Sequence, residues 1–195
     1  MKLGLDASHW NLPNWTALAA AGHRYAFIKA TEGGKFVSPA FFRHWEGARG
    51  VDLVRGAYHF GRLEVSPEEQ VDHFLRIVPD EVGIFYVLDF EFHSIAKTKM
   101  TDEQAREFAT LLGERRPINR KLLYALEPDV ERLMYYPEFD GWFRYVAKYS
   151  NEAPKSAWDF WQYTDVGRVT GARDTTIDLN LYNGSEAAWL ALTQS

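Results

Sequence analysis

Short stretches of aliphatic, aromatic and β-branched residues recur along the chain, and such stretches are typical of β-strands. Several are apolar at consecutive positions, for example Ile84 to Leu88, which is expected for strands covered on both faces of a parallel sheet. The pattern predicts eight strands, at Leu3–Asp6, Tyr25–Ala30, Leu53–Phe60, Ile84–Phe92, Lys121–Ala125, Trp142–Tyr149, Trp158–Tyr163 and Thr176–Tyr182.

Segments with helix signals follow each of the first five strands. Ser66 is a capping residue followed by Pro67 at the first helical position, and Thr101 with Gln104 resembles a capping box. The segment Pro39–Arg49 spaces its aromatic residues three and four apart, as one face of a helix requires. Helices are therefore expected to begin near Asn14, Pro39, Ser66, Thr101 and Glu127.

Alternation of strands and helices implies parallel strands joined by right-handed crossovers. Eight strands suggest a closed barrel, but 195 residues is short of the ~250 of a complete eightfold barrel. The prediction is an α/β fold, an irregular TIM-like barrel of about five βα units followed by three strands with few or short helices. An open doubly wound sheet is the alternative. Without a linker or a repeat, one domain over residues 1–195 is expected.

Composition narrows the choice of partners. The formal net charge of −5 argues against nucleic acid as a partner, because phosphate binding needs a basic surface. The absence of cysteine excludes thiol catalysis and cysteine metal sites. Seven Trp, ten Tyr and thirteen Phe fit either a large core or a groove in which sugar rings stack on aromatic faces. Neither an apolar export segment nor a membrane-spanning run is present, so no membrane insertion is expected.

Asp89 and Glu91 are the sharpest chemical feature of the sequence. They stand two apart after an apolar run, so both side chains are expected on one face of the strand. Buried carboxylates are unfavourable unless they are used or paired, whereas on a half-exposed strand they would be ordinary surface charges. A carboxylate pair suits glycoside cleavage, in which one group donates a proton and the other stabilises or attacks the anomeric carbon. The spacing leaves both the retaining (~5–5.5 Å) and inverting (~6.5–9.5 Å) separations open.

Asp6 and Asp178 lie on the first and last predicted strands, which are neighbours if the barrel closes. Either could be a turn or capping aspartate, but four carboxylates converging on one lumen favour a catalytic pocket. The histidines lack metal-binding spacing, so no metal site is expected. Candidate substrate-binding residues at or near the strand ends are Lys29, Glu32, Tyr58, His59, Tyr124, Trp161, Gln162 and Asn180.

Five sequence blocks, in order, resemble family 25 glycoside hydrolases, the Chalaropsis-type lysozymes (N-acetylmuramidases) that include phage endolysins. The blocks are Gly4–Trp10, Phe27–Gly33, Gly56–Phe60, Leu88–Glu91 and Trp161–Thr164 with Gly167, Gly171 and Ile177–Tyr182. Ala7 and Ala172 depart from the bulkier residues usual in the family, which bears on glycan preference and not on the reaction class.

The resemblance implies cleavage of the β-1,4 bond between N-acetylmuramic acid and N-acetylglucosamine in peptidoglycan, without a cofactor. It implies an incomplete barrel, with Glu91 as general acid and Asp89 assisting at the anomeric centre or orienting the acetamido group. Asp6 and Asp178 would line the same pocket, while Tyr58 and Trp161 would help to bind sugar.

The expected partner is therefore the peptidoglycan glycan strand, bound by a monomer without a separate cell-wall-binding module. A phage or prophage enzyme released by a separate route and a secreted mature form are both compatible with the lack of a signal peptide. The rival hypotheses are a sugar-binding domain without turnover, a chitinase and a metal-dependent deacetylase.

Overall fold

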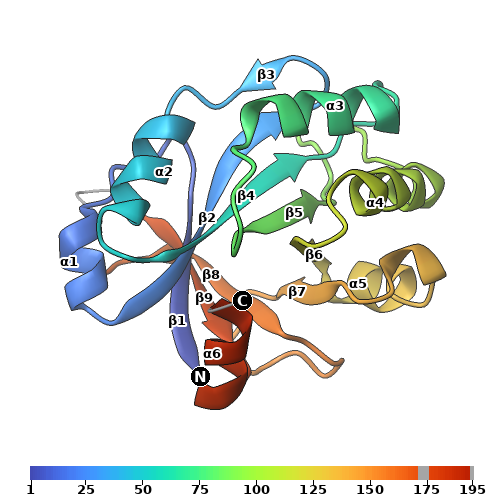
Figure 1. Ribbon diagram of the computed structural model, residues 1–195. Coiled ribbons are helices and arrows are strands. Elements are labelled where there is room, and N and C mark those ends of the chain that lie inside the picture. The colour runs from blue at the N-terminus through green and yellow to red at the C-terminus, as the bar shows by residue number, and fades with distance from the viewer. Residues whose placement is uncertain (171–175, 194–195) are drawn as a thin grey trace.

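The computed structural model describes residues 1–170 and 176–193, and shows a closed eight-stranded barrel surrounded by helices (Figure 1). The barrel strands are β1 (Lys2–Ala7), β2 (His23–Glu32), β4 (Val54–Phe60), β5 (Phe85–Asp89), β6 (Arg120–Leu126), β7 (Phe143–Ala147), β8 (Phe160–Gly167) and β9 (Ile177–Tyr182). Because β1 pairs with both β2 and β9, the sheet closes and the open doubly wound alternative is excluded. Gly171 and Ala172 lie outside the described residues.

The direction of the last strand differs from the prediction of parallel strands. Strands β1, β2 and β4–β8 run parallel, whereas β9 is antiparallel to both of its neighbours, β1 and β8. The connection between β8 and β9 is shorter than the crossover that a parallel pair needs. A two-residue strand, β3 (Phe36–Val37), pairs with the end of β2 outside the barrel.

Five βα units precede the final three strands, as predicted. Their helices are α1 (Trp15–Ala20), α2 (Phe41–Arg49), α3 (Pro67–Ile77), α4 (Asp102–Arg115) and α5 (Glu127–Leu133). Both predicted caps are confirmed, because Ser66 accepts a hydrogen bond from the Glu69 amide and Thr101 forms a capping box with Gln104. A 3-10 turn (Pro137–Phe139) leads into β7. The chain then forms α6 (Glu186–Thr193), which the sequence pattern did not predict.

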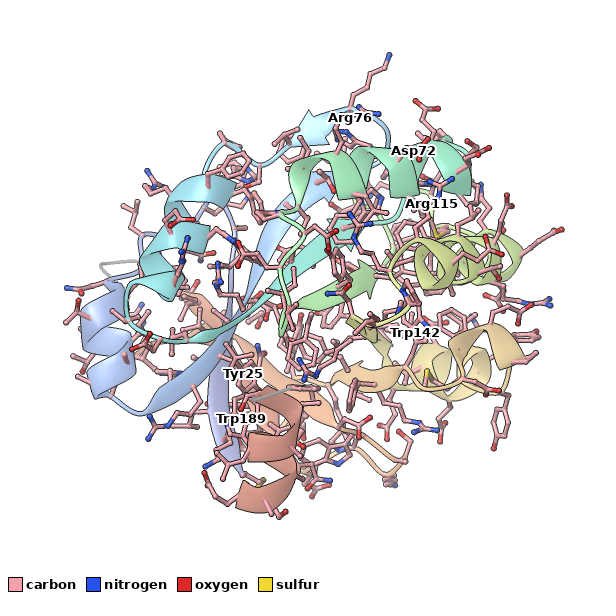
Figure 2. The ribbon with its side chains drawn as sticks, viewed as in Figure 1. Tyr25, Asp72, Arg76, Arg115, Trp142 and Trp189 are labelled. Carbon is pink, nitrogen blue, oxygen red and sulfur yellow. The ribbon has the colours of Figure 1, made fainter. Side chains whose placement is uncertain are left out.

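The helices pack around the outside of the barrel. An ion pair between Asp72 of α3 and Arg115 of α4 joins two neighbouring helices (Figure 2). Among the described residues, no helix combines the length and the apolarity needed to cross a bilayer.

Aromatic side chains fill the inside of the barrel. Phe27 packs against Phe85 and Phe160, with ring centroids 5.9 and 5.4 Å away, and Tyr25 contacts Trp189 of α6 at 5.6 Å. Figure 2 shows Tyr25 and Trp189 next to each other at the end of the barrel where the chain begins. A separate core fills the space between barrel and helices. Part of the aromatic surplus is therefore packing inside the barrel, and a small cavity lies near the carboxyl ends of the parallel strands.

Candidate active site

Four carboxylates meet at the end of the barrel where the parallel strands finish. Asp6 is next to last in β1, Asp89 ends β5, and Glu91 follows that strand by two residues. Asp178 is the second residue of β9 and lies directly opposite Asp6 in the antiparallel ladder. The reversed direction of β9 therefore brings the beginning of that strand to the same end of the barrel as the ends of the others.

The four carboxylates line one small cavity of about 50 Å³. A water molecule occupies about 30 Å³ in the liquid, so this space holds one or two waters and no sugar ring. The lining residues are Asp6, Phe27, Tyr58, Val87, Asp89, Glu91, Tyr124, Tyr145, Gln162 and Asp178.

Asp6 is held by three hydrogen-bond donors. Its Oδ1 accepts from the hydroxyl of Tyr145 at 2.9 Å and from Nδ2 of Asn180 at 2.6 Å, while Oδ2 accepts from Nε2 of Gln162 at 3.0 Å. Burial and the neighbouring Asp178 raise the pKa of Asp6, and the bonds from Asn180 and Tyr145 oppose that rise. With three donors fixing its two oxygens, Asp6 is a rigid part of the cavity wall.

Gln162 connects the two sides of the cavity. Its Oε1 accepts from the hydroxyls of Tyr124 at 2.6 Å and Tyr149 at 3.0 Å. Its Nε2 donates to Asp6 and lies 3.5 Å from Oδ2 of Asp178. Because an amide oxygen only accepts and an amide nitrogen only donates, these partners fix the orientation of the side chain.

Asp89 and Glu91 form the chemically unusual pair. Asp89 is 6% exposed, and within the described part of the chain its buried Oδ1 has no hydrogen-bond partner. Burial and the nearby Glu91 raise the pKa of Asp89 well above its usual range. Burial also raises the pKa of Glu91, which Lys99 and Lys29 oppose. Two such groups retain a proton to higher pH than free carboxylic acids do, which supplies an acid for glycoside cleavage.

Asp178 completes the acidic wall. Burial, Asp165 and Glu91 together raise the pKa of Asp178 to about 7. Tyr58 faces the same group of carboxylates, and burial and these negative charges raise the pKa of its hydroxyl, which therefore stays protonated as a hydrogen-bond donor. The cavity thus combines several carboxyl groups of high proton affinity with neutral hydroxyl donors.

Comparison with known proteins agrees with this geometry. The family model described as glycosyl hydrolases family 25 matches residues 5–172. The chain belongs to this family. It is a glycoside hydrolase with the barrel of the family 25 lysozymes.

Relatives of this family 25 enzyme match it over most of its length. Escherichia coli O6:H1 protein YegX is 33% identical in an alignment 194 residues long, which covers 93% of this chain and 70% of that protein. Lysozyme M1 of Streptomyces globisporus is 28% identical over 217 residues, covering 98% of this chain and 71% of that protein. The solved structure of the bacterial lysozyme from Streptomyces coelicolor superposes with a TM-score of 0.84 at 29% identity, covering 98% and 96% of the two chains.

Seven of the predicted site residues of the family 25 enzyme line the cavity together: Asp6, Asp89, Glu91, Asp178, Tyr58, Tyr124 and Gln162. Asn180 is fully buried and reaches the site through its hydrogen bond to Asp6. Lys29 and Glu32 form an ion pair with each other, 2.9 Å between Nζ and Oε2, and Lys29 is close enough to oppose the raised pKa of Glu91. Neither residue lines the cavity, and their expected contact with substrate stays a prediction.

His59 and Trp161 are not at the cavity, in contrast to the expectation. His59 is fully buried on the outer side of β4, where Nδ1 contacts the Thr31 hydroxyl at 2.8 Å and Nε2 contacts Oε1 of Gln70 at 3.1 Å. Burial lowers the pKa of His59 to about 4. Trp161 faces away from its neighbour Gln162, and its indole N–H donates to the Lys148 carbonyl at 2.8 Å. In both cases the residue beside it in the strand points into the barrel instead.

Several cavity residues were missed by sequence reasoning. Tyr145 lies on a predicted strand and pairs in register with Tyr124, so the two-residue alternation along β7 could have placed it inside the barrel. Phe27 and Val87 are apolar and carry no chemical signal in the sequence. Among residues 1–170 and 176–193, no group of three histidine or acidic side chains is arranged to hold a metal ion.

Proposed function

We propose that this family 25 enzyme cleaves the β-1,4 bond between N-acetylmuramic acid and N-acetylglucosamine in bacterial peptidoglycan, with Glu91 as the proton donor. The observation that carries the proposal is the convergence of Asp6, Asp89, Glu91 and Asp178 on one cavity at the catalytic end of the barrel. The names of the relatives, a lysozyme among the sequences and another among the structures, support peptidoglycan as the substrate and the cell wall as the place of action.

Glu91 suits the role of the acid because it follows the strand and is partly exposed, whereas Asp89 is buried deeper. Its raised pKa, caused first by burial, keeps the proton bound to higher pH than in a free glutamic acid. In the reaction that proton goes to the glycosidic oxygen as the bond to the anomeric carbon breaks. Asp89 assists at the anomeric centre, where positive charge develops, and water then supplies a hydroxyl to this carbon and a proton that restores the active site.

The remaining residues position the substrate. The cavity is too small for a sugar ring, so the ring lies above it and an acetamido group or the anomeric centre approaches Asp89. The hydroxyls of Tyr58 and Tyr124 and the carboxyl group of Asp178 line the walls around that point. Asp6 acts as a fixed hydrogen-bond acceptor in the cavity wall, held by Tyr145, Gln162 and Asn180.

The decisive test is the substitution Glu91→Gln, which keeps the shape of the side chain and removes its titrating proton. Activity on purified cell walls, measured as reducing-end release, is expected to fall by about 10²–10⁴-fold, the usual contribution of a general acid. The control is Glu138→Gln, which removes a carboxylate of an ion pair with Arg106 on the outside of the barrel.

Equal activity in wild type and Glu91→Gln would rule out Glu91 as the acid. Mass spectrometry of the released fragments tests the bond: products that end in N-acetylmuramic acid at the reducing end are expected. Cleavage of chitin in preference to peptidoglycan would overturn the proposed substrate.

A further inference from the structure

Glu91 lies on a loop that the sheet itself does not hold. Strand β5 ends at Asp89, and the Phe90 amide makes a ladder-like bond to the Tyr124 carbonyl, 2.8 Å from N to O. The chain next pairs at His93, which forms an isolated bridge with Thr98. The position of the proposed acid therefore depends on what anchors the segment after it.

Glu32 provides such an anchor from the end of β2. Its Oε1 accepts from Nη1 of Arg62 at 2.7 Å and lies 3.2 Å from Nε2 of His93, while Oε2 accepts from Nζ of Lys29 at 2.9 Å. The Glu32 side chain is only 17% exposed. With three of its roughly four acceptor positions occupied, it has little capacity left for a sugar hydroxyl.

The proton on His93 is directed towards Glu32 by a local contact. The Ala96 amide donates to Nδ1 of His93 at 2.9 Å. Because a backbone N–H can only donate, Nδ1 accepts and the ring proton resides on Nε2, facing Glu32. The loop that carries Glu91 is thereby tied to β2 through His93, two residues further along the chain.

Glu32 also holds the side chain of Lys29. Its Nζ pairs with Glu32 and lies 5.1 Å from the ring centroid of Phe60 and 5.4 Å from that of Phe36. No salt bridge joins Lys29 to Asp89 or Glu91 among the described residues, although its charge opposes the raised pKa of both. The ammonium group therefore limits the rise in pKa of both carboxyl groups without forming an ion pair with either.

We propose that Glu32 is a positioning residue of the reaction, which restrains Lys29 from pairing directly with Asp89 or Glu91 and, through His93, anchors the loop that carries Glu91. The inference rests on the proposed role of Glu91 as the acid. The other charged and titratable groups around Glu91 come from every neighbouring element: Asp6, Tyr58, Asp89, Lys99, Tyr124, Tyr149 and Asp178.

The test compares Glu32→Gln with Lys29→Met on soluble peptidoglycan fragments, with kcat and KM measured across pH. In Glu32→Gln a negative charge is lost and Lys29 is free to approach the carboxylates, and both changes favour the ionised form of Glu91. The alkaline limb of the kcat profile is therefore expected to move to lower pH by on the order of one unit. At pH values on the alkaline limb, kcat of Glu32→Gln is therefore expected to be about tenfold below wild type, with KM unchanged. In Lys29→Met the same limb is expected to move to higher pH.

The matched control is Glu138→Gln, because the Glu138 side chain is 22% exposed and also pairs with an arginine at 2.7 Å, but on the outside of the barrel. Its pH profile is expected to match wild type. A lower Tm in Glu32→Gln with an unmoved profile would show a purely structural ion pair and overturn the inference. A raised KM with an unmoved profile would make Glu32 a sugar ligand, and a shift to higher pH would show that it does not restrain Lys29. Either of these results also overturns the inference.

A second measurement separates this inference from the proposed function. The side-chain carboxyl carbon of Glu91 can be titrated by ¹³C NMR in the resting protein, without substrate. Opposite shifts of that titration in Glu32→Gln and Lys29→Met would support the inference, even if wild type failed to cleave peptidoglycan. Failure of wild type to cleave peptidoglycan would refute the proposed function alone. Unchanged titrations in both variants would overturn the inference whatever the activity.

Discussion

The ionised side chain of Asp178 destabilises the folded chain. Its pKa is raised to about 7 by burial, Asp165 and Glu91, whereas an unfolded aspartate titrates near ~3.8. A carboxyl group whose folded pKa is raised stabilises the fold below the unfolded pKa, and this contribution is lost as pH rises through the folded pKa. The relevant window therefore runs from about pH 4 to about pH 7.

Asp178→Asn is accordingly expected to raise stability at pH 8 by on the order of 2–4 kcal/mol, with little change at pH 4. Thermal unfolding at the two pH values measures this, and a gain in Tm of several degrees is expected at pH 8 only. The exposed Asp140→Asn serves as the control and should leave Tm unchanged at both values. A gain of equal size at pH 4 would contradict the argument, because there the folded state keeps the proton and the unfolded aspartate has lost it only in part.

Strand β4 shows how one element shapes the cavity floor. A Cβ atom added at Gly56 would project into the barrel, 2.5 Å from Cδ1 of Phe27 and 3.0 Å from Cβ of Phe85. Phe27 is itself part of the cavity lining. A larger residue at position 56 would therefore displace the rings that support the carboxylates.

Gly56→Ala is expected to destabilise the protein by about 1–3 kcal/mol through overpacking, and to lower activity because Phe27 moves. Gly113→Ala is the matched control in helix α4, where an added Cβ meets no atom within 4 Å. That change should instead stabilise by about 0.5–1 kcal/mol, since alanine is the better helix former. Urea unfolding measures both, and a neutral Gly56→Ala would contradict the tight packing of the barrel interior.

The last helix covers one end of the barrel. Trp189 of α6 covers the end of the barrel opposite the active site, with its ring 5.6 Å from Tyr25 and 5.2 Å from Tyr182 (Figure 2). The side chain is 6% exposed, although the helix itself lies outside the sheet. The helix thus supplies a side chain to the aromatic column inside the barrel.

Trp189→Ala is expected to lower the free energy of unfolding by about 3–5 kcal/mol, as removal of a large buried aromatic side chain usually does. At temperatures where the variant stays folded, kcat should be close to wild type, because Trp189 is at the far end from the carboxylates. Leu190→Ala, at a neighbouring position that is 42% exposed, is the control and should change stability by less than about 0.5 kcal/mol. Comparable losses in the two variants would show that the packing of Trp189 on the end of the barrel adds nothing specific to stability.

The sequence alone determined the eight barrel strands, the five βα units and the pairing of Asp89 with Glu91, because hydrophobic runs, caps and two-residue spacing are local properties. It also singled out Asp6 and Asp178, which the structure places in the same cavity. The short segment Glu186–Thr193 after the last strand carries weaker periodicity, and its helix was missed.

Only the tertiary structure decided the direction of β9 and which side of each strand faces the cavity. His59 and Trp161 point outwards while Tyr58 and Gln162, their neighbours, point in, since the register of a strand within the sheet fixes its faces. The raised pKa values of Asp89 and Asp178 likewise exist only in the fold, because they result from burial and from charges brought together from distant parts of the chain.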